Sequence, residues 1–257
     1  MSVDAVILAG RANDGKLREA APGEWEALIE ISGKPMIQYV VDALSGSRFV
    51  ERIVVVGPAE LGRGADLGEA EVVPPGGGMV DNVMRGFEAL GDEGGETLVV
   101  TSDIPLITPQ VVDGFIRECG LLDLDFYYPV VRRDLMEARY PGVHRTYAGM
   151  REGQFTGGNM FLVNRGIADD LRKTLDFLVM NRKKPLKMAS VLGVPFLFKM
   201  MLKRLTILEA ERKAGSLYGL KAKAVITTFP EIGFDVDKPS DLSLCKEILS
   251  EILPPRE

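Results

Sequence analysis

The stretch Ala5-Val6-Ile7-Leu8-Ala9-Gly10 decides the fold. An apolar run that ends in a glycine predicts a buried strand opening into a loop. Strand-like and helix-like patterns then alternate, at residues 36–44 (helix), 53–56 (strand), 71–73 (strand), 80–90 (helix) and 97–100 (strand). Short connections between such elements predict an α/β fold, with a Rossmann-like, mostly parallel sheet and helices on both of its faces.

The rest of the chain is less regular. Further strands are expected at residues 126–131, 147–150, 160–163, 224–229 and 234–237, and a last helix opens at Pro239. Residues 165–220 are expected to form a helical insertion within one domain that covers 1–257. The length of 257 residues suits a single domain of this kind.

Composition excludes several classes of function. The net charge of −6 argues against nucleic acid as a partner, because a nucleic-acid-binding surface must neutralise phosphates. The single histidine, His144, argues against Ser-His-Asp or histidine–metal chemistry. Cys119 and Cys245 are far apart in the sequence, and the start of the chain lacks the basic region of a signal peptide. We therefore expect a cytoplasmic protein.

Three loops follow predicted strands and should meet at one site. They contain Gly10, Gly78 and Asp103. Ligands of open α/β sheets bind at the carboxyl ends of the strands, which lie at one edge of the sheet. Asp103 ends a buried strand, where a carboxylate is costly unless it is paired or binds a cation, so we expect it to bind Mg²⁺.

The loops resemble, in order, those of the MobA-like nucleotidyltransferases, which are related to molybdenum cofactor guanylyltransferase and the sugar-phosphate pyrophosphorylases. The matching motifs are Leu8-Ala9-Gly10, Gly33-Lys34-Pro35-Met36-Ile37, Gly78 with Asn82, Asp103-Ile-Pro-Leu106, Thr156-Gly157-Gly158-Asn159, and Asp235-Val-Asp237 before Pro239-Ser-Asp241-Leu242. The resemblance covers residues 3–119 and 156–250. It implies the fold of the nucleotide-diphospho-sugar transferases and transfer of a nucleoside monophosphate from an NTP to a phosphorylated small-molecule acceptor, with release of pyrophosphate.

The same resemblance implies a nucleotide-binding set formed by Leu8, Ala9, Gly10, Arg11, Gly78 and Asn82. A glycine-rich turn lets backbone N–H groups approach phosphate oxygens. The family usually has a second glycine where this chain has Arg11, and a phosphate-binding lysine where it has Glu26. Lys16 or Arg11 must then supply the positive charge, and we predict that Lys16 is the catalytic clamp on the triphosphate.

The residues expected to bind the acceptor, and two of those considered for the metal, lie in the second half of the chain. Gly157, Gly158 and Asn159 are expected to meet the acceptor. Asp235 and Asp237 are expected to alternate along a short strand, to point to opposite faces and to leave only one of them near the metal held by Asp103. The resemblance favours Asp237.

Other functions stay open. Gly10 to Lys16 is one residue short of a phosphate-loop NTPase signature, but Leu17 stands where that signature needs Ser or Thr. Asp235-Val-Asp237 is also typical of glycosyltransferases that use nucleotide-sugars, although it lies late in the chain. Glu26 keeps a third class open, a nucleotide-binding relative without catalysis.

Residues 182–204 combine seven basic residues with an apolar run and no acidic residue. This pattern predicts either an interfacial helix that meets membranes or a lipid-like acceptor, or a helical cap that packs on the sheet or on a second subunit in a homodimer. We favour the cap, because Pro195 interrupts the amphipathic pattern.

Overall fold

The computed structural model describes residues 2–91, 94–168, 172 and 193–252. Within these residues nine strands form one sheet: β1 (Val3–Leu8), β4 (Val50–Val56), β5 (Glu71–Val73), β6 (Glu96–Thr101), β7 (Phe126–Arg132), β8 (Ala148–Met150), β9 (Gly153–Gly157), β10 (Met160–Asn164) and β11 (Ala222–Thr227). A separate two-stranded sheet pairs β2 (Glu30–Ile31) with β3 (Lys34–Pro35).

The large sheet is mostly parallel. Its order is β5-β4-β1-β6-β10-β7-β9-β8, and β11 pairs with β7 in parallel. β1 lies between β4 and β6 and runs parallel to both, while β10 is antiparallel to β6 and β7. The carboxyl ends of β1, β4 and β6 therefore meet at one edge of the sheet, as expected for this architecture.

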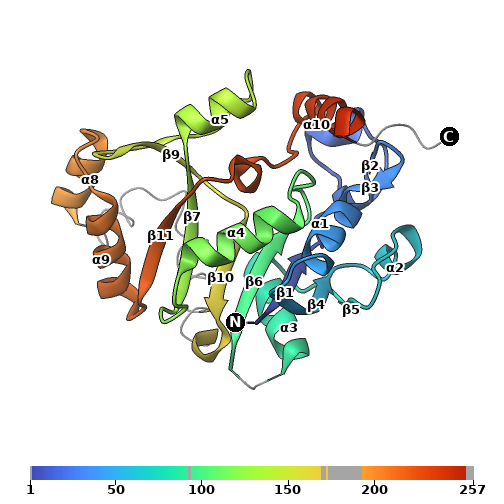
Figure 1. Cartoon of the computed structure of the whole chain (residues 1–257), viewed down its shortest axis with the longest axis horizontal. Coiled ribbons are helices and arrows are strands. Elements are labelled where there is room, and N and C mark those ends of the chain that lie inside the picture. Colours follow the sequence, from blue (N-terminus) through green and yellow to red (C-terminus); the bar gives the residue numbers. More distant parts are fainter. Residues whose placement is uncertain (1, 92–93, 169–171, 173–192, 253–257) are drawn as a thin grey trace.

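Helices cover both faces of the sheet, as predicted. Ala5 and Ile7 of β1 belong to the cluster formed with α1 (Met36–Ser45) and α4 (Pro109–Cys119). Val6 points the other way, into the cluster formed with α3 (Met79–Leu90). Successive side chains of a strand alternate between its faces, so the apolar residues Ala5, Val6 and Ile7 bury both faces of β1. Figure 1 shows α4 and α3 on either side of the central strands.

The remaining helices are short or peripheral. They are η1 (Lys16–Glu19), η2 (Glu26–Leu28), α2 (Leu61–Gly64), α5 (Arg133–Arg139), η3 (Arg165–Ile167), α8 (Val194–Met201), α9 (Ile207–Tyr218), η4 (Pro230–Gly233) and α10 (Pro239–Ile252). Figure 1 places α8 and α9 beyond β11 at one end of the sheet and α10 near the β2–β3 pair at the other. Among the described residues, every helix is too short or too polar to cross a membrane.

Outside the insertion, every helix and strand predicted from the sequence is confirmed except one. The predicted strand at 234–237 is wrong, because these residues follow η4 without forming a strand. The hairpin of β8 and β9 was only half predicted, since β9 was not expected.

The insertion predicted at 165–220 is described in part, as η3, α8 and α9. Residues 169–171 and 173–192, and with them much of the basic segment 182–204, lie outside the described residues. Pro195 does not interrupt a helix here, because it lies in the first turn of α8, where proline is tolerated. Phe198, Met200 and Met201 are exposed in this helix. The choice between a cap and a membrane contact stays a prediction.

Candidate active site

The loop after β1 packs directly against the loop that leads into α3. A side-chain carbon built at Gly10 would lie 2.9 Å from the Pro75 Cβ, so only glycine fits there without displacement. The Asn82 side chain accepts a hydrogen bond from the Gly76 N–H at 2.6 Å and also lies against Gly10. Asn82 therefore shapes both loops. Its predicted contact with a base or ribose stays a prediction.

Leu8 and Ala9 contribute to this region through their backbone. The Ala9 N–H donates to the Val56 carbonyl at 2.8 Å, and the Leu8 carbonyl accepts from the Ser102 N–H at 3.2 Å. Ala9 is buried, and Gly78, the residue before α3, is exposed. Leu8 and Ala9 thus tie the Gly10 loop to the neighbouring strand ends, and Gly78 is the more open of the two loop glycines.

Three carboxylates gather beside these loops. Asp103, Asp235 and Asp237 each offer an oxygen atom, and these oxygens lie within 4.8 Å of one another. The Val236 N–H donates to the Asp103 carbonyl at 2.9 Å, which fixes the segment against the end of β6. All three of the predicted metal ligands therefore come together.

The expectation that Asp235 and Asp237 point to opposite faces is wrong. Residues two apart in an extended segment project to the same side, and the residue between them projects to the other. The Val236 side chain is fully buried, so both aspartates are turned away from the core and towards Asp103.

Crowding of the three carboxylates shifts their pKa values apart. Burial raises the pKa of Asp103, and the nearby charge of Asp237 raises it further, against the opposing effects of the Thr101 hydroxyl and of Arg11. Burial raises the pKa of Asp235 to about 7. For Asp237, hydrogen bonds to Asp235 and Arg11 outweigh burial and lower the pKa. The site is thus short of positive charge.

Arg145 is a site residue that sequence reasoning missed. Its side chain is buried, and its guanidinium lies 3.2 Å from an Asp235 carboxylate oxygen and 3.4 Å from one of Asp241. It also donates to the backbone carbonyls of Gly233 and Asp235. The segment around Arg145 is irregular and carries no motif, so only the structure reveals that it holds the Asp235 loop in place.

The two candidates for the triphosphate clamp lie in different surroundings. Lys16 is exposed in η1, and the described residues provide no ion pair for it. Arg11 lies at the centre of the site, with Nε 3.1 Å from Glu26 Oε2 and Nη1 3.0 Å from Asp237 Oδ1. Of the two basic side chains, Arg11 is therefore the one that reaches the acid cluster.

The Thr156-Gly157-Gly158-Asn159 motif packs within the protein. Side-chain carbons at Gly157 and Gly158 would lie 2.1 Å from the Tyr128 hydroxyl and 2.6 Å from Ile232. The Asn159 N–H donates to the Ile232 carbonyl at 2.9 Å, and the Asn159 carbonyl accepts from the Thr101 N–H at 3.1 Å. Gly157 thus lets β9 lie close to Tyr128 of β7, Gly158 lets the next residue approach η4, and Asn159 links the ends of β6 and η4. Its contact with an acceptor stays a prediction.

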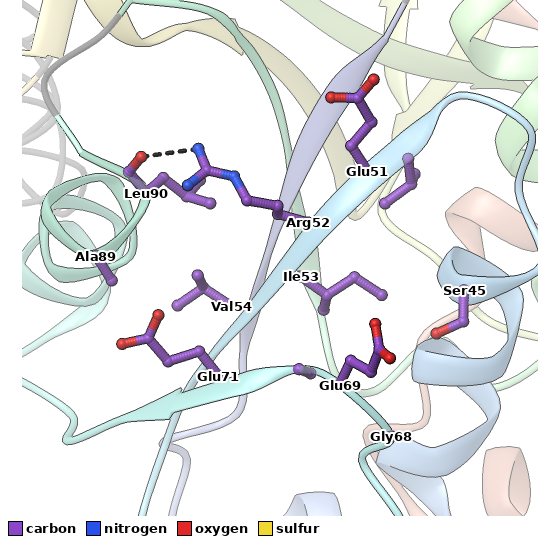
Figure 2. A pocket seen from close by; sticks show the side chains of 12 residues that line it. Ser45, Glu51, Arg52, Ile53, Val54, Gly68, Glu69, Glu71, Ala89 and Leu90 are labelled. Atoms are coloured by element: carbon purple, nitrogen blue, oxygen red, sulfur yellow. Dashed lines mark hydrogen bonds between the residues drawn. The ribbon is translucent and has the colours of Figure 1, made fainter.

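A cavity of about 500 Å³ lies elsewhere, at the amino ends of β4 and β5. Figure 2 shows that the Arg52 side chain lines this cavity and donates a hydrogen bond to the Leu90 carbonyl, which is 2.8 Å long. Arg52 is also paired with Asp4, at 2.9 Å. Because this cavity is at the edge of the sheet opposite the acid cluster, we place the functional site at the cluster.

The acid cluster suits a hard divalent cation. All of its donors are carboxylate oxygens, which Mg²⁺ prefers over nitrogen or sulfur. The spacing of these oxygens permits a shared ion, and the loops around Gly10 and Gly76 lie alongside. The residues present therefore fit the metal that the sequence led us to expect.

Residues 5–218 match the family model of the MobA-like NTP transferase domain. The chain belongs to this family. The match covers most of β1, the Gly10 and Asp103 loops and most of the insertion. It ends before Asp235 and Asp237.

Individual members of the family agree with this assignment. A probable molybdenum cofactor guanylyltransferase from Pyrococcus horikoshii is 33% identical over 125 residues, which are 46% of this chain and 57% of the relative. A 2-C-methyl-D-erythritol 4-phosphate cytidylyltransferase from Frankia casuarinae is 34% identical over 102 residues, 38% of each chain. The chain thus matches 57% of the first relative's length and only 38% of the second's.

A solved structure shows a longer likeness. A hypothetical transferase from Thermus thermophilus is 33% identical and superposes with a TM-score of 0.83, over 94% of this chain and all of that one. This likeness therefore extends beyond residues 5–218, which match the family model.

Proposed function

We propose that this protein transfers a nucleoside monophosphate from an NTP to a phosphorylated acceptor and releases pyrophosphate, with Mg²⁺ held by Asp103, Asp235 and Asp237. The observation that carries the proposal is the meeting of three carboxylates beside a glycine loop, at the carboxyl edge of a parallel sheet. The family supports the reaction class, because its named members transfer guanylyl or cytidylyl groups.

The reaction needs no nucleophilic side chain. An acceptor phosphate oxygen attacks the α-phosphorus, the bond to the bridging oxygen of the β-phosphate breaks, and pyrophosphate leaves in line. The bound cation supplies charge neutralisation at the phosphate oxygens. The protein's part is to position the reactants: Gly10 lets the loop after β1 pack closely on the loop before α3, and Asn82 holds that second loop.

The carboxylates need support of their own. Arg145 holds the Asp235 backbone and side chain, and Thr101 donates a hydrogen bond to Asp103. Fixed oxygens lose little freedom when they bind a cation, which favours cation binding by these carboxylates. Two buried thiols, Cys119 and Cys245, also support a cytoplasmic location for the protein.

A screen of the four NTPs against phosphorylated acceptors, with Mg²⁺ and detection of pyrophosphate, tests the proposal. Acceptors should include pterin, sugar and alditol phosphates, because the relatives differ in the base and in the acceptor. We expect pyrophosphate release that requires both Mg²⁺ and one class of acceptor. Nucleotide binding without pyrophosphate release from any pair would favour a non-catalytic relative instead.

A further inference from the structure

Four carboxylates lie at the site, and two guanidinium groups of the described residues contact them. Glu26 joins Asp103, Asp235 and Asp237, and the cations are Arg11 and Arg145. A polyphosphate that enters such a site meets strong repulsion unless a cation can reach it. The identity of that cation therefore decides how the site binds nucleotide.

Arg145 is not available to a ligand. Its side chain is only 8% exposed, and its nitrogens are engaged by two carboxylates and two backbone carbonyls. Arg11 differs, because its side chain is 58% exposed and it follows Gly10 directly in the loop after β1. Arg11 is thus the guanidinium of the site that a ligand can reach.

Glu26 holds one side of Arg11. Its side chain is only 4% exposed, and its Oε2 lies 3.1 Å from the Arg11 Nε. That oxygen has no hydrogen-bond partner of good geometry among the described residues. A buried carboxylate is costly unless a cation compensates it. Glu26 therefore holds the Arg11 Nε at this position, and the two Nη groups of Arg11 are left for other partners.

The other side of Arg11 lies on the acid cluster. Its Nη1 is 3.0 Å from Asp237 Oδ1 and 4.0 Å from Asp103 Oδ2, so it contacts the oxygens that a divalent cation would need. One guanidinium thus competes with the metal for the carboxylates. It would stop competing if it turned to phosphate, with which guanidinium forms bidentate hydrogen bonds.

We propose that Arg11, positioned by Glu26, is the triphosphate-binding cation of this site, and that it covers Asp237 until a nucleotide draws it away. This inference rests on the proposed function for its ligand, the triphosphate of an NTP. It replaces Lys16 by Arg11 as the clamp. It also makes triphosphate and divalent cation bind cooperatively, because moving Arg11 frees an oxygen for the metal.

Calorimetry with two probes tests the proposal, namely inorganic triphosphate in excess Mg²⁺ and Mg²⁺ alone. Arg11→Gln should weaken triphosphate binding about 10- to 100-fold, as for a lost charge-assisted contact. The same variant should bind Mg²⁺ alone roughly two- to fivefold more tightly than wild type, because a competing cation has gone. A purely structural role would not move the two affinities in opposite directions.

Glu26→Gln tests the positioning role. Made alone, it should weaken triphosphate binding. Combined with Arg11→Gln, it should add little further loss, as expected for two residues that act together. Arg11→Lys should restore part of the affinity. Arg18→Gln, on an exposed basic residue of η1, is the matched control and should bind as wild type. Tighter triphosphate binding by Glu26→Gln would overturn the positioning role, since repulsion would then dominate.

The outcomes separate this inference from the proposed function. Unchanged triphosphate binding in Arg11→Gln, with a loss in Lys16→Gln, would overturn the inference and leave nucleotidyl transfer standing. Arg11-dependent binding of triphosphate without pyrophosphate release from any NTP and acceptor would support the inference and overturn the proposed function. Melting curves of all variants establish that each one folds.

Discussion

Carboxylates lie at both ends of the central strands, and they differ in their positively charged partners and in the direction of their pKa shifts. At the amino end, Asp4 of β1 binds Arg52 at 2.9 Å and Arg165 at 2.8 Å. Hydrogen bonds from these two arginines outweigh burial and lower the pKa of Asp4. At the carboxyl end, burial and mutual repulsion raise the pKa values of Asp103 and Asp235.

The difference separates a structural acid from a functional one. Two arginines serve one aspartate at the amino end, so the chain itself neutralises the charge. At the carboxyl end three aspartates lie together, and the deficit of positive charge is left for a ligand to fill. The cavity beside Arg52 belongs to the neutralised end, which is why its volume does not mark the active site.

The largest effect should come from Asp103. We expect Asp103→Asn to lower Mg²⁺-dependent pyrophosphate release on the order of a hundredfold or more, because the amide keeps the shape but lacks the charge of a metal ligand. The fold should remain, since the substitution removes a carboxylate that its surroundings disfavour. Turnover like that of the wild type would show that the charge deficit has no catalytic role.

Asp235 and Asp237 should behave as partners. Because both face Asp103, we expect Asp235→Asn and Asp237→Asn each to weaken Mg²⁺ binding, at least on the order of tenfold. Calorimetric titration of Mg²⁺ measures this, and Asp134→Asn, at an exposed carboxylate paired with Arg132, is the control. A loss in only one of the two variants would restore the expectation of opposite faces.

Asp4 should show the reverse behaviour. We expect Asp4→Asn to lower the free energy of unfolding by about 1–3 kcal/mol, because Arg165 loses a charged partner, and to leave Mg²⁺ affinity unchanged. The contribution of a carboxylate with a lowered pKa is present above its unfolded pKa and disappears in acid. Urea unfolding at pH 7 and below pH 3.8 should therefore show the variant approaching wild type at the lower pH. An unchanged stability at pH 7 would contradict the structural role.

The smallest effect concerns Glu96, at the start of β6. Burial, together with the charge of Asp125, raises its pKa to about 7 against the opposing effect of Arg165. A raised pKa in the folded state means that stability falls as the pH rises from about 4.5 to about 7. We expect Glu96→Gln to remove this fall, so that at pH 8 it is on the order of 1–2 kcal/mol more stable than wild type. Parallel stability curves for the two proteins between pH 5 and pH 8 would refute it.

The sheet and the meeting of its loops could be predicted from the sequence, because both follow from local patterns. The apolar run of β1 and the hydroxyl cap of α4 at Thr108 are features of neighbouring residues. Parallel strands then bring Gly10 and Asp103 to one edge without any knowledge of side-chain contacts.

The details of the site depend on pairs of residues far apart in the chain. Arg145 and Asp235 are separated by 90 residues, and no spacing rule connects them. The pairing of Arg11 with Glu26 could have been predicted from the sequence. Arg11 takes the place of a glycine that is usual in the family and Glu26 that of a lysine, so two opposite charges appear in one loop region. The error about Asp235 and Asp237 was one of geometry, since residues two apart share a side.

Thermal unfolding with increasing Mg²⁺ tests the central claim most directly, in wild type, Asp103→Asn and Asp4→Asn. A cation that binds only the folded state raises the melting temperature further as its concentration increases above its dissociation constant. We predict a rise for wild type, an equal rise for Asp4→Asn from a lower starting temperature, and none for Asp103→Asn. A rise in Asp103→Asn as large as that of the wild type would contradict the account, because the cation would then bind outside the acid cluster.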